Sequence, residues 1–164
     1  MVFAAIIIKL ESKGPVLFIQ ERIGKGNEIF KIMKFRSMKL HDEATHSKYA
    51  DKKDSRITKF GNFMRKTRID ELPQLINVLK GEMSLVGPRP VVEKELERYG
   101  DDAEYYLMAK PGMTGLWQVS GRNDVDYATR VYLDGWYVKN WSLWYDIAIM
   151  FKTIGVVLHR DGAY

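Results

Sequence analysis

Two short apolar segments near the start of the chain flank a turn, and this pattern limits the possible folds more than any other. Residues 16–19 and 29–33 are rich in Val, Ile, Leu and Phe, and the glycine-rich residues 24–27 (GKGN) lie between them. Strand-forming runs on both sides of such a turn predict a β-hairpin. Because side chains alternate across a strand, Lys34 and Arg36 at its end are expected on one face, where two cations need an anion nearby.

Most of the remaining chain has helical periodicity. Helices are predicted at residues 57–66, 72–79, 91–99, 103–108, 127–139 and 141–158. The helix after Asp70 has a clear stop signal at Lys80 and Gly81. With 164 residues, 46% of them hydrophobic, the chain can bury a core. The expected fold is therefore α+β, a small β-hairpin packed with several helices, some of them amphipathic helices at a membrane surface.

Two further segments carry arginines under backbone constraint. Residues 83–90 contain two prolines that bracket Arg89, so this stretch cannot be helical and fixes the direction of Arg89. Residues 113–122 have regularly spaced glycines and strand-forming residues, which predicts a loop or short strand that presents Arg122. A planar guanidinium grips phosphate oxygens in pairs, so both arginines are candidate phosphate clamps, with surface salt bridges as the alternative.

The adjacent carboxylates Asp70 and Glu71, hereafter the acid pair, have two compatible interpretations. Asp is a favoured N-cap and Glu suits the first turn of a helix, so the pair can simply begin the helix at residues 72–79. Alternatively, Asp70 is a nucleophile that the helix dipole keeps ionised and that attacks phosphorus. Glu71 can then hold Mg²⁺, since Mg²⁺ prefers carboxylate and phosphate oxygens.

The charges around the pair favour the reactive interpretation. Several cations lie on constrained segments and are expected to converge on one anion: Lys34, Arg36, Arg65, Lys66, Arg68, Arg89 and Arg122. Asp134, among the aromatic residues of the helix predicted at 127–139, has three open roles: a satisfied buried polar residue, an acceptor for a sugar hydroxyl, or a partner of a metal ligand.

Composition excludes other kinds of site. The formal charge of +5 favours anionic partners such as phosphates, an acidic membrane surface or a nucleic acid. The absence of cysteine excludes a disulfide framework and a thiolate zinc site, and His41, His46 and His159 lack metal-ligand spacing. No nucleic-acid partner is expected, because recognised nucleic-acid-binding signatures are missing and the acid pair would repel phosphodiesters.

Two apolar segments raise the question of a membrane. Residues 1–8 are far shorter than the roughly 20 residues that a spanning helix needs. They form either the end of a hydrophobic helix or a short buried strand. Residues 141–158 are strongly apolar but contain Asp146 and Lys152, which predicts a helix lying at a membrane interface or a core helix of a soluble domain.

Three long motifs resemble the bacterial sugar transferases, the monotopic phosphoglycosyl transferases. They are residues 34–38 (KFRSM), 70–90 (DELPQLINVLKGEMSLVGPRP) and 110–122 (KPGMTGLWQVSGR). The resemblance covers nearly the whole chain from Gly14 to Tyr164. Residues 95–121 and 136–164 are most similar to undecaprenyl-phosphate galactose phosphotransferases.

The resemblance implies transfer of a sugar 1-phosphate from a UDP-sugar to undecaprenyl phosphate, which initiates synthesis of a surface polysaccharide (O-antigen, capsule or exopolysaccharide). UDP-galactose is the expected donor. By the family pattern, Asp70 is the nucleophile that forms the phosphosugar intermediate and releases UMP, and Glu71 binds Mg²⁺ with Asp70 beside it. Lys34, Arg89 and Asp134 match functionally important positions, and with Arg36 and Arg122 they form the expected substrate-binding set.

The resemblance also implies a membrane location, at the cytoplasmic face of the bacterial inner membrane. Residues 1–10 correspond to the last turns of an N-terminal helix that enters the membrane in family members, and residues 11–164 to the catalytic domain. Larger galactose enzymes carry further membrane helices and another domain upstream. A competing hypothesis is an inactive fragment that serves as a membrane-surface or partner-binding module. The oligomeric state, a homo-oligomer included, stays open.

Overall fold

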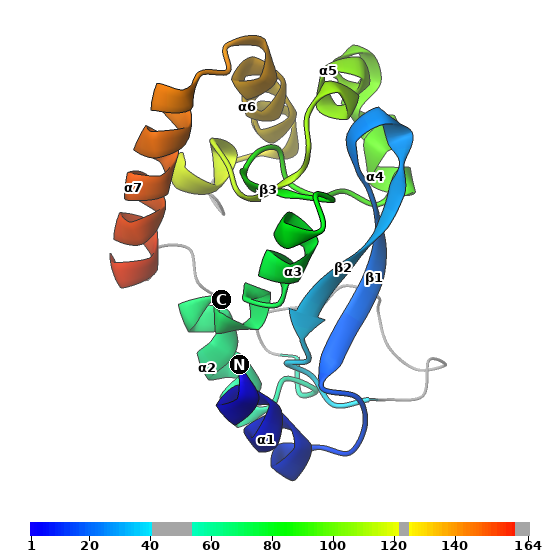
Figure 1. The fold of residues 1–164 in the computed structure, drawn as a ribbon, viewed down its shortest axis with the longest axis vertical. Coiled ribbons are helices and arrows are strands. Elements are labelled where there is room, and N and C mark those ends of the chain that lie inside the picture. Colours follow the sequence, from blue (N-terminus) through cyan, green and yellow to red (C-terminus); the bar gives the residue numbers. More distant parts are fainter. Residues whose placement is uncertain (41–53, 122–124, 160–164) are drawn as a thin grey trace.

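The computed structural model describes residues 1–40, 54–121 and 125–159. In chain order the elements are α1 (Val2–Glu11), β1 (Leu17–Ile23), η1 (Lys25–Asn27), β2 (Ile29–Phe35), α2 (Lys59–Thr67), η2 (Ile69–Glu71), α3 (Gln74–Leu79), β3 (Ser84–Val86), α4 (Glu93–Leu96), η3 (Glu97–Asp102), α5 (Ala103–Met108), β4 (Gly112–Thr114), η4 (Trp117–Val119), α6 (Tyr127–Lys139) and α7 (Leu143–His159), where η marks a 3-10 helix. In Figure 1 the hairpin lies on one side of α3 and α7 on the other. The predicted α+β fold is confirmed.

The predicted hairpin is confirmed in its strands and its turn. β1 and β2 pair antiparallel from Leu17 opposite Phe35 to Ile23 opposite Ile29. The tight connection needs positive φ at Gly26 (67°) and Asn27 (65°), which Gly adopts freely and Asn more readily than most residues.

One buried asparagine attaches α3 to the free edge of β2. The Asn77 side-chain carbonyl accepts from the Met33 N–H (3.1 Å), and its amide group donates to the Lys31 carbonyl (2.8 Å). Asn77 is completely buried, and it satisfies backbone groups that an unpaired strand edge would leave open. The contact fixes α3, and the acid pair just before it, against the hairpin.

A second sheet of two short parallel strands, β3 and β4, was not predicted. Ser84 lies opposite Gly112 and Val86 opposite Thr114. The strands approach so closely at Gly87 that a Cβ atom there would collide with the Lys110 carbonyl. This sheet holds the segment that leads into Arg89.

The predicted helix at residues 91–99 is wrong in extent. Only Glu93–Leu96 is α-helical, and Glu97–Asp102 forms a 3-10 helix that a positive φ at Gly100 interrupts. Val91 is instead extended and bridges to Ile23 of β1, so tertiary pairing overrides the helical pattern at its start.

The N-terminal apolar run is a helix, so the alternative of a buried strand is excluded. Ala4 and Ile8 of α1 pack with Phe35 and Met64, whereas its other apolar side chains stay exposed: Val2, Phe3, Ile6 and Leu10. α7 likewise buries Ile149 against Val86 and Tyr137 and exposes Leu143, Trp144, Phe151, Ile154 and Leu158. Within the described ranges, every helix is too short or too polar to cross a bilayer.

Candidate functional site

A tight turn between α2 and α3 places the acid pair. α2 ends at Thr67, and Arg68 adopts a left-handed conformation (φ 57°) that leads directly into η2. Asp70 therefore lies inside a 3-10 turn and caps nothing with its side chain, while Pro73 occupies the N-cap position of α3. The prediction that Asp70 is an N-cap is wrong, because the left-handed Arg68 starts the helical turn two residues early.

Glu71 reaches across to the hairpin. Its carboxylate accepts from the Lys34 ammonium group at 2.9 Å, and both side chains are partly buried. Lys34 lies at the end of β2, so this ion pair joins the hairpin to η2. The structure thus brings together three predicted site residues, Lys34, Asp70 and Glu71.

The electrostatics of Asp70 differ from the expectation that a helix dipole keeps it ionised. Burial, followed by repulsion from Glu71, raises the pKa of Asp70 to about 6, and the positive charges of Lys34 and Arg65 oppose this shift. The following helix has only six residues, so its dipole is small. At pH 7 about nine-tenths of the carboxyl is still ionised.

Arg36 does not join the acid pair. Its guanidinium donates to the backbone carbonyls of Ser12 and Lys13 (2.9 and 2.7 Å), and the residue is 6% exposed. It therefore fastens the segment after α1 to the end of the hairpin, although Lys34, two residues earlier, turns to Glu71.

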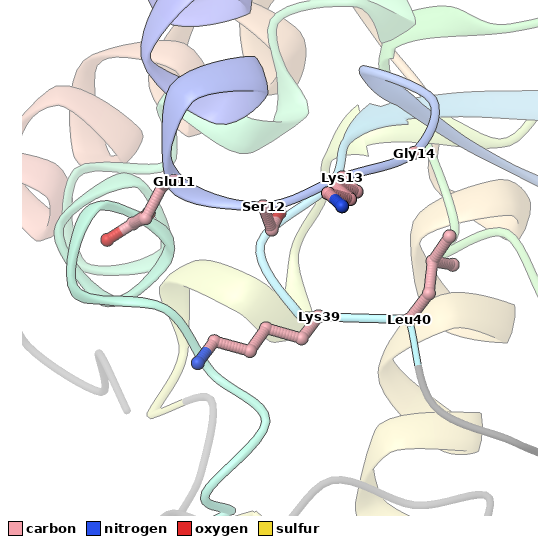
Figure 2. A pocket seen from close by; sticks show the side chains of 6 residues that line it. All are labelled: Glu11, Ser12, Lys13, Gly14, Lys39 and Leu40. Carbon is pink, nitrogen blue, oxygen red and sulfur yellow. The ribbon is translucent and has the colours of Figure 1, made fainter.

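The pocket beside this segment lies away from the acid pair. A hollow of about 430 Å³ separates residues 11–14 from Lys39 and Leu40, as Figure 2 shows. It is lined by Glu11, Ser12, Lys13, Gly14, Lys39 and Leu40, and none of the predicted site residues is among them.

Arg89 belongs to a second group of charges. Three guanidiniums surround the Glu95 carboxylate, at 3.2 Å (Arg130), 3.8 Å (Arg22) and 3.9 Å (Arg89). We call these three arginines with Glu95 the arginine cluster. Arg22, Glu95 and Arg130 were not predicted, since nothing in the local sequence distinguishes them from surface charges.

The hairpin relates the two groups of charges. Phe18 lies opposite Lys34, and Arg22 opposite Phe30. Phe18 and Arg22 are four residues apart on one strand, so Lys34 and Arg22 extend from the same face. The separation along the strand is roughly 13 Å. The acid pair and the arginine cluster therefore adjoin opposite ends of one hairpin face.

Asp134 is buried behind the arginine cluster. It is 1% exposed, and its carboxylate accepts from the Tyr99 hydroxyl at 2.9 Å. Burial raises the pKa of Asp134 to about 7, against the Tyr99 hydrogen bond and the charges of Arg130 and Arg89. The other carboxylate oxygen of Asp134, Oδ1, is buried and makes no hydrogen bond within the described residues, so of the three open roles the geometry matches a buried polar residue that is only half satisfied.

Not every predicted residue can be placed. Arg122, His41 and His46 lie outside the described residues. Among the residues that are described, no three His, Cys, Asp or Glu side chains gather to hold a metal ion. The acid pair offers two adjacent carboxylates, which fits Mg²⁺ because this ion takes its remaining ligands from water and substrate phosphates.

Comparison with known proteins identifies the family of this chain. The family model described as "Bacterial sugar transferase" matches residues 1–160. The chain is 60% identical to a UDP-galactose-lipid carrier transferase of Erwinia amylovora and 59% identical to an undecaprenyl-phosphate galactose phosphotransferase of Salmonella typhimurium, covering 92% of this chain and 35% of each relative. It is 44% identical to a UDP-glucose:undecaprenyl-phosphate glucose-1-phosphate transferase of Escherichia coli, covering 98% of this chain and 36% of that protein. The chain thus spans about a third of the length of these relatives, and it belongs to the bacterial sugar transferase family.

Proposed function

We propose that this chain carries the catalytic centre of a transferase that moves a sugar 1-phosphate from a UDP-sugar to undecaprenyl phosphate. The names of the relatives support the donor and the acceptor. The observation that carries the proposal is Asp70, a partly buried carboxyl whose pKa is raised to about 6, beside an ion-paired Glu71. A desolvated carboxylate that is still ionised near neutral pH is a suitable nucleophile.

The proposed reaction has two displacements at one phosphorus. An Asp70 carboxylate oxygen attacks the phosphorus that bears the sugar, and the bond from this phosphorus to the bridging oxygen breaks, so UMP leaves. A phosphate oxygen of undecaprenyl phosphate then attacks the same phosphorus, and the Asp70 carboxylate leaves. Each step needs cations near the phosphoryl oxygens, and Lys34 and Arg65 supply positive charge at Asp70.

Glu71, with Asp70 beside it, would hold Mg²⁺. When bound, this ion would neutralise charge on the donor phosphates and polarise their oxygens. Lys34 holds the Glu71 carboxylate at 2.9 Å and so orients it next to Asp70. Loss of Lys34 would therefore disturb both members of the pair.

Arg89 is the exposed cation of the second group, with 41% of its side chain exposed, and it is the proposed clamp for the donor diphosphate. Arg122 stays a predicted clamp. Asp134 supports Arg130 and Arg89 from behind and does not touch the substrate, because it is buried. Arg36 is left out of the proposed binding set, since its guanidinium already donates hydrogen bonds to the backbone carbonyls of Ser12 and Lys13.

The proposed location is the inner-leaflet surface on the cytoplasmic side. The exposed apolar side chains of α1 and α7 suit partial insertion between lipid headgroups, with the indole rings of Trp141 and Trp144 at headgroup depth. A surface location also gives access to a lipid-linked acceptor. Galactose 1-phosphate is the proposed transferred group because the two more similar relatives are named for galactose, and the one at 44% identity for glucose.

The test is UMP release from UDP-galactose and UDP-glucose with Mg²⁺ and detergent-solubilised undecaprenyl phosphate. We expect galactose-dependent release by the wild type, loss of about 1,000-fold or more in Asp70→Asn, and little change in the control Asp101→Asn, whose carboxyl is exposed. Mass spectrometry of wild-type protein incubated with donor alone should find a phosphosugar on Asp70. An unmodified Asp70 in an active preparation contradicts the covalent step.

The competing hypothesis, an inactive membrane-binding module, makes the opposite prediction. Such a module would bind liposomes through the exposed faces of α1 and α7 and release no UMP from any UDP-sugar. Turnover by the wild type excludes it.

A further inference from the structure

The arginine cluster has more donors than acceptors. In the described part of the chain, Glu95 is the one carboxylate within ion-pair distance of Arg22, Arg89 and Arg130, and all three approach it within 4 Å. The Nε atoms of Arg22 and Arg130 are buried and make no hydrogen bond within that part. With Asp134 nearby the group carries three positive and at most two negative charges, so it attracts a further anion.

The three arginines are held to different degrees. The Arg130 side chain is 9% exposed, and its guanidinium lies over the Trp117 ring, 5.0 Å from the centroid. Arg22 is also tied down, since it donates to the Pro90 carbonyl (3.1 Å) and the Gln20 side chain (2.7 Å). Within the described residues, Arg89 makes a 3.9 Å approach to Glu95 and a 5.9 Å contact with Trp117, so its guanidinium keeps donors for a ligand.

Glu95 itself is well anchored. It lies on α4, where the Tyr127 hydroxyl donates to its backbone carbonyl at 3.0 Å. Opposite α4, the Arg89 segment is fixed to β1, because the Ile23 N–H donates to the Val91 carbonyl (2.9 Å) and the Tyr106 hydroxyl bridges the Ile23 carbonyl and the Val91 N–H. The carboxylate therefore has a defined place from which to direct the exposed guanidinium of Arg89.

We propose that Glu95 is a positioning residue, which holds the guanidinium of Arg89 against Arg22 and Arg130 so that it can meet the diphosphate of a nucleotide-sugar donor. This inference rests on the proposed function and adds a residue that does not touch the reacting atoms. Glu95 limits the repulsion among three guanidiniums and competes with the donor for them. It therefore aligns the donor at the expense of affinity.

Replacement of Glu95 by Gln separates these two effects. Glu95→Gln removes the negative charge with almost no change in shape, so the cluster should attract a diphosphate more strongly, and we expect UDP to bind about three- to tenfold more tightly at low salt. The Arg89 guanidinium is then no longer held in a fixed orientation. We therefore expect kcat for UMP release to fall about 10- to 100-fold, while the KM for the donor stays level or falls. A merely structural defect would weaken binding and turnover together.

Two variants control the experiment. Glu95→Asp keeps the charge and should bind UDP within about twofold of wild type. Glu93→Gln makes the same charge change at an exposed position of α4 and should leave UDP affinity and kcat unchanged. Thermal unfolding of each variant identifies any loss of folded protein.

The measurements are isothermal titration calorimetry with UDP and Mg²⁺ at low and high salt, and UMP release from UDP-galactose. Unchanged or weaker UDP binding by folded Glu95→Gln, or a kcat equal to wild type, overturns the inference. Tighter UDP binding by Glu95→Gln in a protein whose wild type releases no UMP supports the cluster as a diphosphate site and overturns the proposed transferase function instead.

Discussion

The acid pair and the arginine cluster are two charged sites that adjoin one hairpin face. Carboxylates are in excess in the first group, and guanidiniums in the second. At the acid pair two carboxylates adjoin, and the pKa of Asp70 rises because burial and Glu71 outweigh Lys34 and Arg65. At the arginine cluster three guanidiniums share Glu95, and the pKa of Arg22 falls because burial and the Arg89 charge outweigh that carboxylate. A nucleotide-sugar diphosphate with Mg²⁺ has charges that would complement both sites. The two sites cannot neutralise each other, because they are roughly 13 Å apart along the strand.

Within the arginine cluster, the largest effect is expected at its exposed member, Arg89. Arg89→Ala should lower kcat/KM for UMP release about 100- to 1,000-fold, because it removes a bidentate phosphate contact. Arg89→Lys should lose about tenfold, since it keeps the charge and not the planar fork. Arg98→Ala is the matched control, because Arg98 stacks on Tyr127, 3.6 Å from the ring centroid, and is not one of the arginines paired with Glu95. Equal activity of Arg89→Ala and wild type would remove Arg89 from the site.

The second effect tests whether Asp134 supports the cluster. Asp134→Ala leaves the buried Tyr99 hydroxyl without its acceptor and removes a negative charge near Arg130, so we expect the free energy of unfolding to fall by about 2–4 kcal/mol. Asp134→Asn keeps an acceptor for Tyr99 and should lose about 1 kcal/mol. Denaturant unfolding measures both values. A full loss of activity in a stable Asp134→Asn protein would instead indicate direct contact with the substrate.

Much of the fold could be predicted because its signals are local. The hairpin follows from its turn residues, and α6 has the predicted bounds, with Asp126 as a cap whose side chain accepts from the Thr129 N–H. The parallel pair of β3 and β4 could not be predicted, since three-residue strands 28 positions apart carry no periodicity. The Asn77 contact with β2 has no local signal for the same reason: it joins residues 44 positions apart.

In the site, too, the local features could be predicted and the contacts between distant segments could not. Asp70 and Glu71 are neighbours in the chain, so the acid pair could be predicted, whereas the raised pKa of Asp70 could not, because it depends first on burial. Lys34 and Arg36 were expected to act together, yet one pairs with Glu71 and the other with backbone carbonyls, because the strand ends at Phe35 between them. The role of Glu95 could not be predicted, because it depends on arginines from three separate segments: β1, α6 and the residues after β3.

A smaller effect tests how the charge of Lys34 influences the pKa of Asp70. Lys34→Met removes a positive charge that lowers the pKa of Asp70, so this pKa should rise further and the acid limb of the activity profile should move to higher pH. We expect UMP release to fall about three- to tenfold at pH 6 and less at pH 8. Lys31→Met, on the exposed side of the same strand, is the control. Parallel losses at both pH values would assign Lys34 a role other than tuning Asp70.

The smallest effect concerns what the acid pair costs in stability. The pKa of Asp70 is about 6 in the folded chain and near 3.8 when exposed, so the folded state binds more protons between these values. The contribution of this carboxyl to the free energy of unfolding therefore decreases as pH rises from about 4 to about 6, and above that it is a constant penalty. Asn at position 70 carries no such penalty.

Asp70→Asn should accordingly be more stable than wild type by about 1–2 kcal/mol at pH 7.5, and the difference should vanish near pH 4. Denaturant unfolding at several pH values measures the difference, and Asp101→Asn, exposed and remote from the pair, should show no such trend. If Asp70→Asn is instead less stable at neutral pH, then Lys34 and Arg65 outweigh burial and Glu71, and the imbalance at this end of the hairpin face has the opposite sign. If the penalty is present, the chain keeps a destabilising carboxylate at the place where the proposed chemistry requires a poorly solvated nucleophile.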